Sequence, residues 1–430
     1  MKGTTMDVIV AGAGSAGLSL GLVLARRGVR VAVVGRPQSP GAAAVLGAFG
    51  DVTSAVLKSP HGRTKLDWTH RASKLWPEWL ASLSDGTELM TAHGTVVVLN
   101  TVGLPDVDTA NYHAIRTALE SYDEPFEDLD PEDVDWLDPE PTARPMRAMF
   151  LPQEHAVNAH LLLLRLEQAF LAAGGVLVPE AVVRAGRGVE LESGTSMSAG
   201  NVVLTQPPGL VNACAVSALV DTDDGTLPRS VIRTPNRAFA SGACVIPHGN
   251  GQLQVGAMEV FSPSPRTAAP VGDVLHLLNC AARQIRRGVG ESGVREIQLD
   301  NRPVSLDGLP LLGETDEDGV WVMTGPHQDS LTLVPLLANE MAALLLGEET
   351  AADLDLLRPT RTPAAPLSRA ETVAAAVTHL MATGYESNWA APVEWPALLE
   401  ATAATELYRN PAEAPGGTDA LIKAGMFPQA

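Results

Sequence analysis

The chain has 430 residues, with 50 acidic against 30 basic side chains and a formal net charge of −20 at pH 7. Its length predicts two or three domains, and 45% hydrophobic residues indicate a globular protein rather than a disordered or fibrous one. The acidic balance excludes nucleic acid as the main partner, because phosphate binding needs a basic surface. No apolar run is long enough to span a membrane, and Cys214, Cys244 and Cys280 lack metal or disulfide spacing. We therefore expect a cytoplasmic protein without a metal site.

The first motif is a glycine-rich turn between two predicted strands. Residues 6–10 predict a buried strand, 18–27 a helix and 29–34 a second strand. Glycines spaced as GxGxxG at such a turn let the backbone approach a pyrophosphate, and the helix end offers N–H groups to it. The pattern predicts a dinucleotide site, and its alternative is a turn used only for packing. The residues of the turn are Gly12, Ala13, Gly14, Ser15, Ala16 and Gly17.

The acidic residue that usually holds the ribose hydroxyls is missing after the second strand. Gly35 stands where that carboxylate is expected, and Arg36 follows it. Arg36 is a candidate for contact with a phosphate or with adenine, and its alternative is an ordinary surface arginine.

Further elements follow in chain order. The pattern predicts a helix over 72–83 kinked at Pro77, a strand at 96–99, a solvated acidic connection over 121–140 and a helix over 160–173 capped by Asn158. Four strands come next, at 176–178, 182–185, 188–191 and 201–204. They are followed by a hairpin over 238–258, a helix over 273–287, a strand at 320–324 and a last helix over 331–346. This order suggests that two distant segments build one nucleotide domain.

Five segments, in this order and spacing, resemble one family of flavoenzymes: the FAD-dependent D-amino-acid oxidase, glycine oxidase and sarcosine oxidase family. The resemblance spans residues 6–360. Its carriers are Gly12 to Gly17, Phe150-Leu151-Pro152 through Asn158, Val255-Gly256-Ala257-Met258-Glu259, Arg302-Pro303 with Asp307-Gly308-Leu309-Pro310, and Gly325 with His327.

The resemblance implies a mixed α/β fold: a glutathione-reductase-type, Rossmann-like FAD-binding domain with an interleaved substrate domain on a mixed β-sheet. We expect the FAD-binding domain to comprise 1–100, 151–215 and 301–360, the substrate domain 101–150 and 216–300, and an extension 361–430. The FAD is expected to be non-covalent, because no cysteine lies near Arg302 or His327. Besides Gly12 to Gly17 and Arg36, the implied FAD contacts are Ala43, Ala44, Val183, Gly325, Gln328, Asp329, Ser330 and Leu331.

The implied reaction is hydride transfer from an amine-bearing carbon to flavin N5, which gives an imine. Arg302 matches the family arginine that binds a substrate carboxylate, and its alternative is a structural arginine beside a proline. His327 lies where relatives place a residue next to the flavin, for function or for packing. Cys244 occupies the position of an active-site tyrosine, so we expect a substrate other than a simple free amino acid; its alternative is a small core residue.

Two other functions are compatible with these motifs. The same fold suits an FAD-dependent desaturase or hydroxylase of secondary metabolism, and it also suits an accessory flavoprotein that has lost activity. The expected partner is a small amine or amino acid, without nucleic acid or membrane. Residues 361–430 are candidates for a contact in a homo-oligomer, a contact with a partner, or a cover over the substrate entrance.

Overall fold

The computed structural model describes residues 6–36, 41–207, 210–236, 242–262, 264–305, 307–325, 330–351 and 353–362, with a few isolated residues between 378 and 405. The side chains of 105, 211, 257–261 and 330 are not among the described parts. His327, Gln328, Asp329 and nearly all of the extension 361–430 lie outside the described residues, so the predictions made for them stay predictions.

The first large sheet has a parallel core in the order β9-β2-β1-β12-β19. Its strands β10 and β11 continue antiparallel from the beginning of β12, and β18 pairs antiparallel with β19. The parallel strands are short and apolar, as expected for strands buried on both faces. The strands are β1 (Met6–Ala11), β2 (Val31–Val34), β9 (Val176–Val178), β10 (Val182–Ala185), β11 (Gly188–Leu191), β12 (Ser196–Leu204), β18 (Leu311–Glu314) and β19 (Val320–Thr324).

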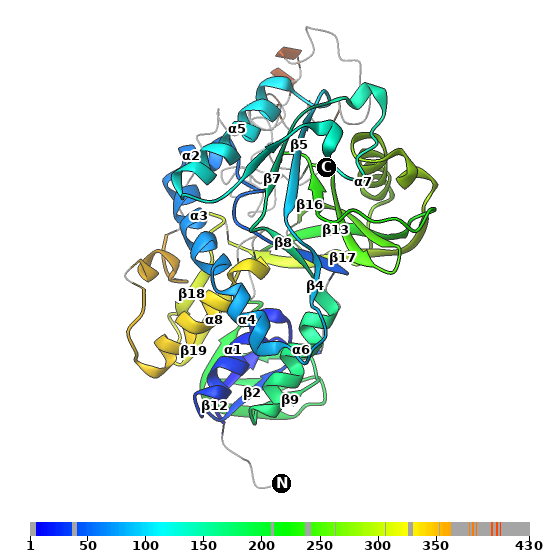
Figure 1. Cartoon of the computed structure of the whole chain (residues 1–430). Coiled ribbons are helices and arrows are strands. Elements are labelled where there is room, and N and C mark those ends of the chain that lie inside the picture. The colour runs from blue at the N-terminus through cyan, green and yellow to red at the C-terminus, as the bar shows by residue number, and fades with distance from the viewer. Residues whose placement is uncertain are drawn as a thin grey trace.

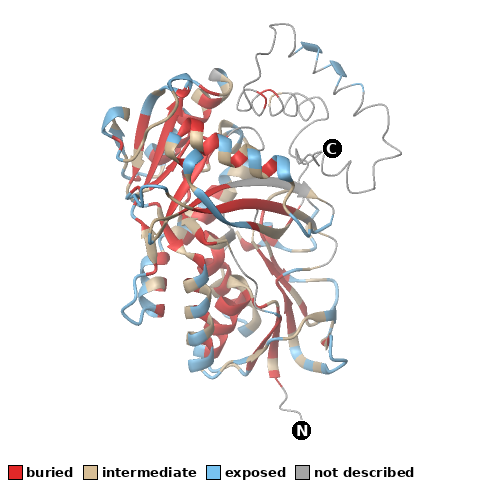
Figure 2. Cartoon of the chain, turned by 90° about the vertical axis from the view of Figure 1, so that its right-hand side faces the viewer, coloured by how far each residue is buried: buried red, intermediate tan, exposed pale blue. Residues whose placement is uncertain are grey.

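Helix α1 lies at the centre of the layer that covers this sheet, between α6 and α8 (Figure 1). Residues 17–25 of α1 are all buried, because neighbouring helices cover its sides while the sheet covers its inner face. Figure 2 shows the resulting buried layer in red. The helices of this half are α1 (Ser15–Arg26), α3 (Pro60–Ser73), α4 (Trp76–Leu83), α6 (Ala159–Ala172) and α8 (Ser330–Leu346).

The second large sheet has the order β17-β13-β16-β15-β14-β5-β7-β6 and is antiparallel except for the β14–β5 pair. Helix α7 packs on one face, and α5 packs near β5 on the opposite face. The strands are β5 (Thr95–Asn100), β6 (Glu127–Leu129), β7 (Pro145–Leu151), β13 (Val211–Asp221), β14 (Val231–Arg233), β15 (Cys244–Gly249), β16 (Gln252–Ser262) and β17 (Gly293–Val304). The helices are α2 (Ser54–Lys58), α5 (Pro105–Ser121) and α7 (Val271–Gln284), with 3-10 turns at Pro131–Asp133, Pro141–Ala143, Arg287–Glu291 and Leu354–Leu357.

A small third sheet joins the two large ones. It has the order β3-β8-β4, with β3 (Ala43–Leu46), β8 (His155–Asn158) and β4 (Met90–Ala92). Apolar side chains of β3 and β8 pack against β14 and β15 of the second sheet. Because β8 leads directly into α6, this small sheet connects the second sheet to the helical layer of the first.

Two sequence-based predictions need correction. The predicted single helix over 72–83 is two helices, because α3 ends at Ser73 and α4 begins at Trp76. Pro77 lies in the first turn of α4, where its missing N–H costs nothing, so it starts a helix instead of kinking one. The acidic stretch 121–140 is not wholly irregular, because β6 forms the edge of the second sheet within it.

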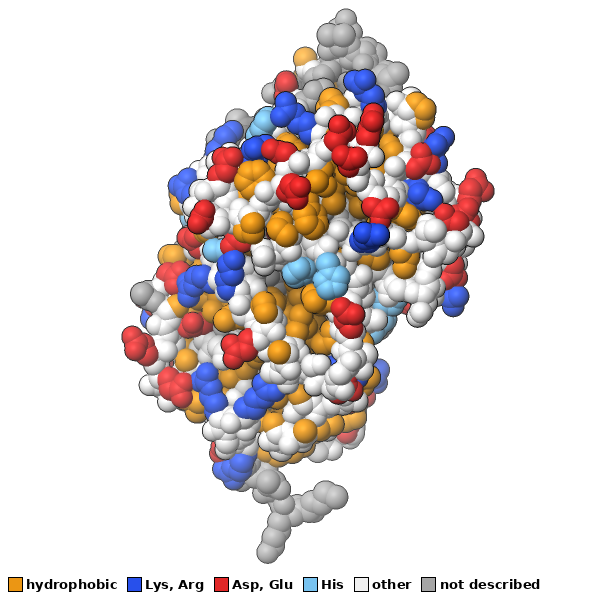
Figure 3. All heavy atoms as spheres, in the orientation of Figure 1, with side chains coloured by type: hydrophobic (Ala, Val, Ile, Leu, Met, Phe, Trp, Pro, Cys, Tyr) orange, Lys and Arg blue, Asp and Glu red, His pale blue; other side chains and the backbone are white. Residues whose placement is uncertain are grey.

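Charged side chains of both signs are interspersed on the face drawn in Figure 3. Exposed ion pairs occur on the described surface, such as Arg116 with Asp128 at 2.8 Å and Arg287 with Asp138 at 2.7 Å. Among the described residues, no helix is long and apolar enough to cross a membrane.

We predict that Asn158→Ala weakens α6. The Asn158 side chain accepts a hydrogen bond from the N–H of Leu161 at 2.9 Å and caps the helix, as the sequence predicted. Losing such a cap costs about 1 kcal/mol, so the midpoint of chemical denaturation should fall. Asn158→Asp keeps a capping oxygen and should retain the midpoint; an equal loss in both variants would contradict the cap.

Candidate functional site

The turn after β1 is closed against the end of β12. Gly12 has a φ of +130°, and its N–H donates to the carbonyl of Val34 at 2.8 Å. Both the N–H and the hydroxyl of Thr205 donate to the carbonyl of Ala11 at 3.1 Å. A Cβ atom at Gly12 would lie 2.0 Å from the Thr205 hydroxyl oxygen, so only glycine fits there.

The turn leads straight into α1 without a capping side chain. Gly14 is the N-cap, no side chain bonds there, and the first turn holds no acidic residue. A Cβ at Gly17 would lie 1.9 Å from the carbonyl oxygen of Gly12, so the helix starts tightly against the turn. Ala13, Ser15 and Ala16 complete the turn, and we call residues 12–17 the glycine cradle. Because no side chain caps α1 and no acid lies in its first turn, its N–H groups and the positive end of its dipole suit an anionic phosphate.

The missing acid after β2 has a steric explanation. A Cβ at Gly35 would lie 2.8 Å from the backbone nitrogen of Ala13, so no carboxylate side chain fits at this position without moving the turn. Arg36 follows and forms an ion pair with Glu192, with Nε 3.2 Å from the carboxylate; this bond lowers the pKa of Glu192. Val183, on β10, is 62% exposed.

Two glutamines of the second sheet hold the beginning of β3. The amide oxygen of Gln254 accepts from the N–H of Ala43 at 2.6 Å, and its Nε2 donates to the Ala43 carbonyl at 2.9 Å. Gln298 accepts from the N–H of Ala42 at 3.0 Å. Ala43 is buried and Ala44 is half-buried. The sequence analysis missed both glutamines, because each alternates with apolar neighbours in its strand, as a solvent-facing residue would.

Arg302 and Cys244 lie on the same face of the second sheet as these glutamines. Successive side chains of a strand alternate between faces, so Arg302 points to the same side of β17 as Gln298. Its Nε donates to the carboxylate of Asp300 at 2.7 Å, and both side chains are partly exposed. Cys244 packs with Ala43 on this face. Burial raises the pKa of its thiol to about 11, so it stays protonated at neutral pH.

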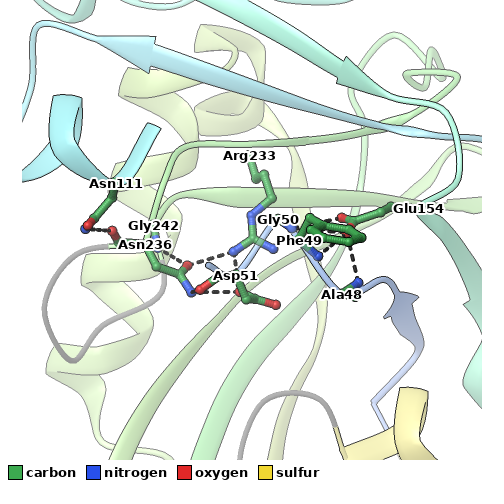
Figure 4. Close-up of polar contacts among 9 residues, drawn as sticks. All are labelled: Ala48, Phe49, Gly50, Asp51, Asn111, Glu154, Arg233, Asn236 and Gly242. Carbon is green, nitrogen blue, oxygen red and sulfur yellow. Dashed lines mark hydrogen bonds and ion pairs between the residues drawn. The ribbon is translucent and has the colours of Figure 1, made fainter. Parts of the chain in front are cut away.

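Figure 4 shows a buried polar cluster around Arg233, which was also missed from the sequence. Arg233 lies opposite Cys244 in the β14–β15 pair. Arg233 donates to Asp51 at 2.5 Å and to the amide oxygen of Asn236 at 2.7 Å. Asn236 in turn donates to Asp51 at 2.7 Å. Burial raises the pKa of Asp51, but the attraction of Arg233 outweighs it and lowers that pKa overall. The signal available in the sequence was an arginine at the end of an apolar strand.

The first turn of α8 meets the segment after β3. The N–H of Gly47 donates to the hydroxyl of Thr332 at 3.4 Å, and Trp76 Nε1 donates to the Thr332 carbonyl at 2.8 Å. Gly325 follows Thr324, the last residue of β19, whose hydroxyl donates to the Pro303 carbonyl at 3.3 Å. Leu331 packs against the core, and Ser330 begins the helix. The end of β19 therefore lies beside Arg302–Pro303.

Known proteins share this architecture. The chain is 28% identical over 352 residues to "Putative thiamine biosynthesis oxidoreductase ThiO" of Rhizobium etli, which covers 80% of this chain and 98% of that protein. Glycine oxidase from Geobacillus kaustophilus superposes with a TM-score of 0.69 at 23% identity, over 83% of this chain and 99% of that one. Iminodiacetate oxidase (IdaA) from Chelativorans sp. BNC1 gives a TM-score of 0.68 at 17% identity, over 82% and 98%. The predicted fold class is confirmed.

The sequence pattern described as "FAD dependent oxidoreductase" (DAO) matches residues 7–344. The match takes in the glycine turn, the small sheet, the second sheet and the end of β19. It confirms the family, the FAD cofactor and the oxidoreductase class that the motifs predicted. The chain therefore belongs to the DAO family of FAD-dependent oxidoreductases.

Proposed function

We propose that this protein oxidises the C–N bond of a small amine or amino acid to an imine. The observation that carries the proposal is the placement of Arg302 on the face of the second sheet that supports β3. The named activities of glycine oxidase and iminodiacetate oxidase support the same substrate class. When bound, FAD supplies the hydride acceptor, N5, while the chain binds and orients the substrate.

The glycine cradle fits the pyrophosphate of FAD. The uncapped start of α1 offers N–H groups and the positive end of a dipole, and Gly12 and Gly17 allow close approach. We assign the pyrophosphate to Gly12, Ala13, Gly14, Ser15, Ala16 and Gly17, and the adenosine to Arg36 and Val183. We assign the isoalloxazine ring of a non-covalently bound FAD to Ala43, Ala44, Gly325, Ser330 and Leu331. Gln328 and Asp329 are assigned to the ring on sequence grounds alone.

Arg302 would bind a substrate carboxylate. Its bond to Asp300 fixes the plane of the guanidinium, which suits a planar, bidentate partner. Cys244, protonated and packed against β3, would form part of the substrate wall instead of acting as a nucleophile. His327 is proposed beside the substrate from the sequence alone.

The three buried cysteines form no disulfide, which supports our proposal of a reducing, cytoplasmic location. A homo-oligomer or partner contact through residues 361–430 stays a prediction.

The substrate class is tested by anaerobic reduction. We expect the FAD-loaded protein to be yellow and to lose its flavin absorbance without oxygen when an amine or amino acid from a broad panel is added. The measurement is the flavin spectrum after each addition, with dithionite as the control for reducibility. If dithionite bleaches the flavin but no amine or amino acid of the panel does, the result contradicts amine oxidation.

Arg302→Ala should weaken binding of carboxylate substrates. Removing one partner of a charge-assisted contact costs about 2 kcal/mol or more, which raises the apparent Kd for reductive titration about 30-fold. Arg295→Ala is the matched control, because Arg295 lies on the same strand in an exposed pair with Asp221. Equal affinities in both variants would remove the carboxylate role of Arg302.

Gly17→Ala should weaken FAD binding. The added methyl group would lie 1.9 Å from the Gly12 carbonyl oxygen and force the turn and α1 apart. Overpacking of about 1–3 kcal/mol corresponds to a rise of about 5- to 150-fold in the Kd for FAD, measured by flavin fluorescence. Gly272→Ala in α7 adds the same group where no atom lies within 4 Å, and it should bind FAD normally.

A further inference from the structure

The turn that follows β3 is built around one buried carboxylate, Glu154. The carboxylate accepts the N–H of Ala48 at 2.9 Å, of Phe49 at 2.5 Å and of Gly50 at 3.1 Å (Figure 4). Glu154 is only 3% exposed. A buried carboxylate that accepts hydrogen bonds from several backbone N–H groups fixes the path of the chain around it, because each donor would otherwise lack a partner.

Two glycines make room for this carboxylate. A Cβ at Gly47 would lie 2.5 Å from the carboxyl carbon of Glu154, and one at Gly50 would lie 2.7 Å from its Oε2. Any larger residue at either position would displace Glu154 or the turn. The turn and the carboxylate are therefore packed as a single unit.

This unit touches both elements that we assign to the flavin ring. It continues directly from β3, which holds Ala43 and Ala44, and the N–H of Gly47 donates to Thr332 in the first turn of α8. We propose that Glu154 is a positioning residue, which aligns β3 and the start of α8 on the FAD ring and makes that alignment depend on its own protonation. The proposal rests on the FAD placement given above.

The surroundings of Glu154 place its titration near neutral pH. Burial raises its pKa from the ordinary 4.5 to about 7, against the opposing N–H groups of Phe49 and Gly50. Arg233 lowers this pKa and Asp51 raises it. Another charged group, Glu124, lies across the small cavity that Glu154 lines, together with its partners Lys74 and His70. His155, next in the chain, has a pKa lowered by burial.

Protonation should loosen the turn. Among the described residues, the hydrogen-bond partners of the carboxylate are N–H donors, so a carboxylic O–H would face donors instead of an acceptor. The folded chain also holds this proton more tightly than the unfolded chain. The stability of the fold should therefore decrease as pH rises from about 4.5 to about 7, the window between the two pKa values.

The test is a pH titration of the FAD-loaded protein, followed by visible absorption and circular dichroism of the flavin. Between about pH 5.5 and about pH 8.5 the wild type should show one transition with a midpoint near 7. Glu154→Gln should lack that transition, resemble the acid form of the wild type throughout, and bind FAD about tenfold more weakly. Glu124→Gln is the matched control, because Glu124 lines the same cavity but bonds to Lys74 and His70. It should keep the transition.

A wild type without the transition, or a Glu154→Gln protein that retains it, overturns the proposal. If Glu154→Gln does not fold, Gly50→Ala crowds the carboxylate without removing it, and its transition should shift by comparison with the wild type; an unshifted transition overturns the proposal as well. Failure of the proposed function looks different, because a panel that never bleaches the flavin leaves the pH transition untouched.

Discussion

The site depends on how one short segment, residues 41–50, crosses between the two large sheets. A crossing segment has backbone N–H and carbonyl groups that no regular sheet satisfies on every side, and buried groups of this kind are costly when unpaired. Here side chains supply the partners. Gln254 and Gln298 bond the beginning of β3, and Glu154 bonds the turn at its end.

This solution couples regions that are far apart in the sequence. Gln254 and Gln298 belong to the second sheet, Glu154 immediately precedes β8, and Thr332 belongs to α8 in the first half. Because buried hydrogen bonds in one network are coupled, a shift in β3 would change the hydrogen bonds of each of these side chains. The same face of the second sheet carries Arg302, so the proposed substrate contact and the proposed flavin contact share one support.

Local patterns predicted much of this fold and part of the site. The glycine spacing of Gly12 to Gly17, the Asn158 cap and the alternation of strands and helices each follow from rules that act within a few residues. Gln254 and Glu154 were missed because their partners lie up to about 200 residues away, and the sequence pattern does not show which polar residue faces inward. Asp300 was missed although it lies two residues from Arg302, because adjacency alone does not distinguish an ion pair from two solvated charges.

The net charge of −20 opposes an anionic cofactor, so the local charge at each helix end matters. The helices α2, α3 and α6 have capping side chains, from Thr53, Ser59 and Asn158, and α4, α5 and α7 carry acidic residues in their first turns. Among the α-helices whose N-caps are described, α1 alone has neither. A cap would occupy the N–H groups, and an acid would neutralise the dipole. Because α1 has neither, its N-terminus at the glycine turn stays available to phosphate. The local electrostatic potential at this helix end, and not the net charge of the chain, therefore decides whether an anion binds there.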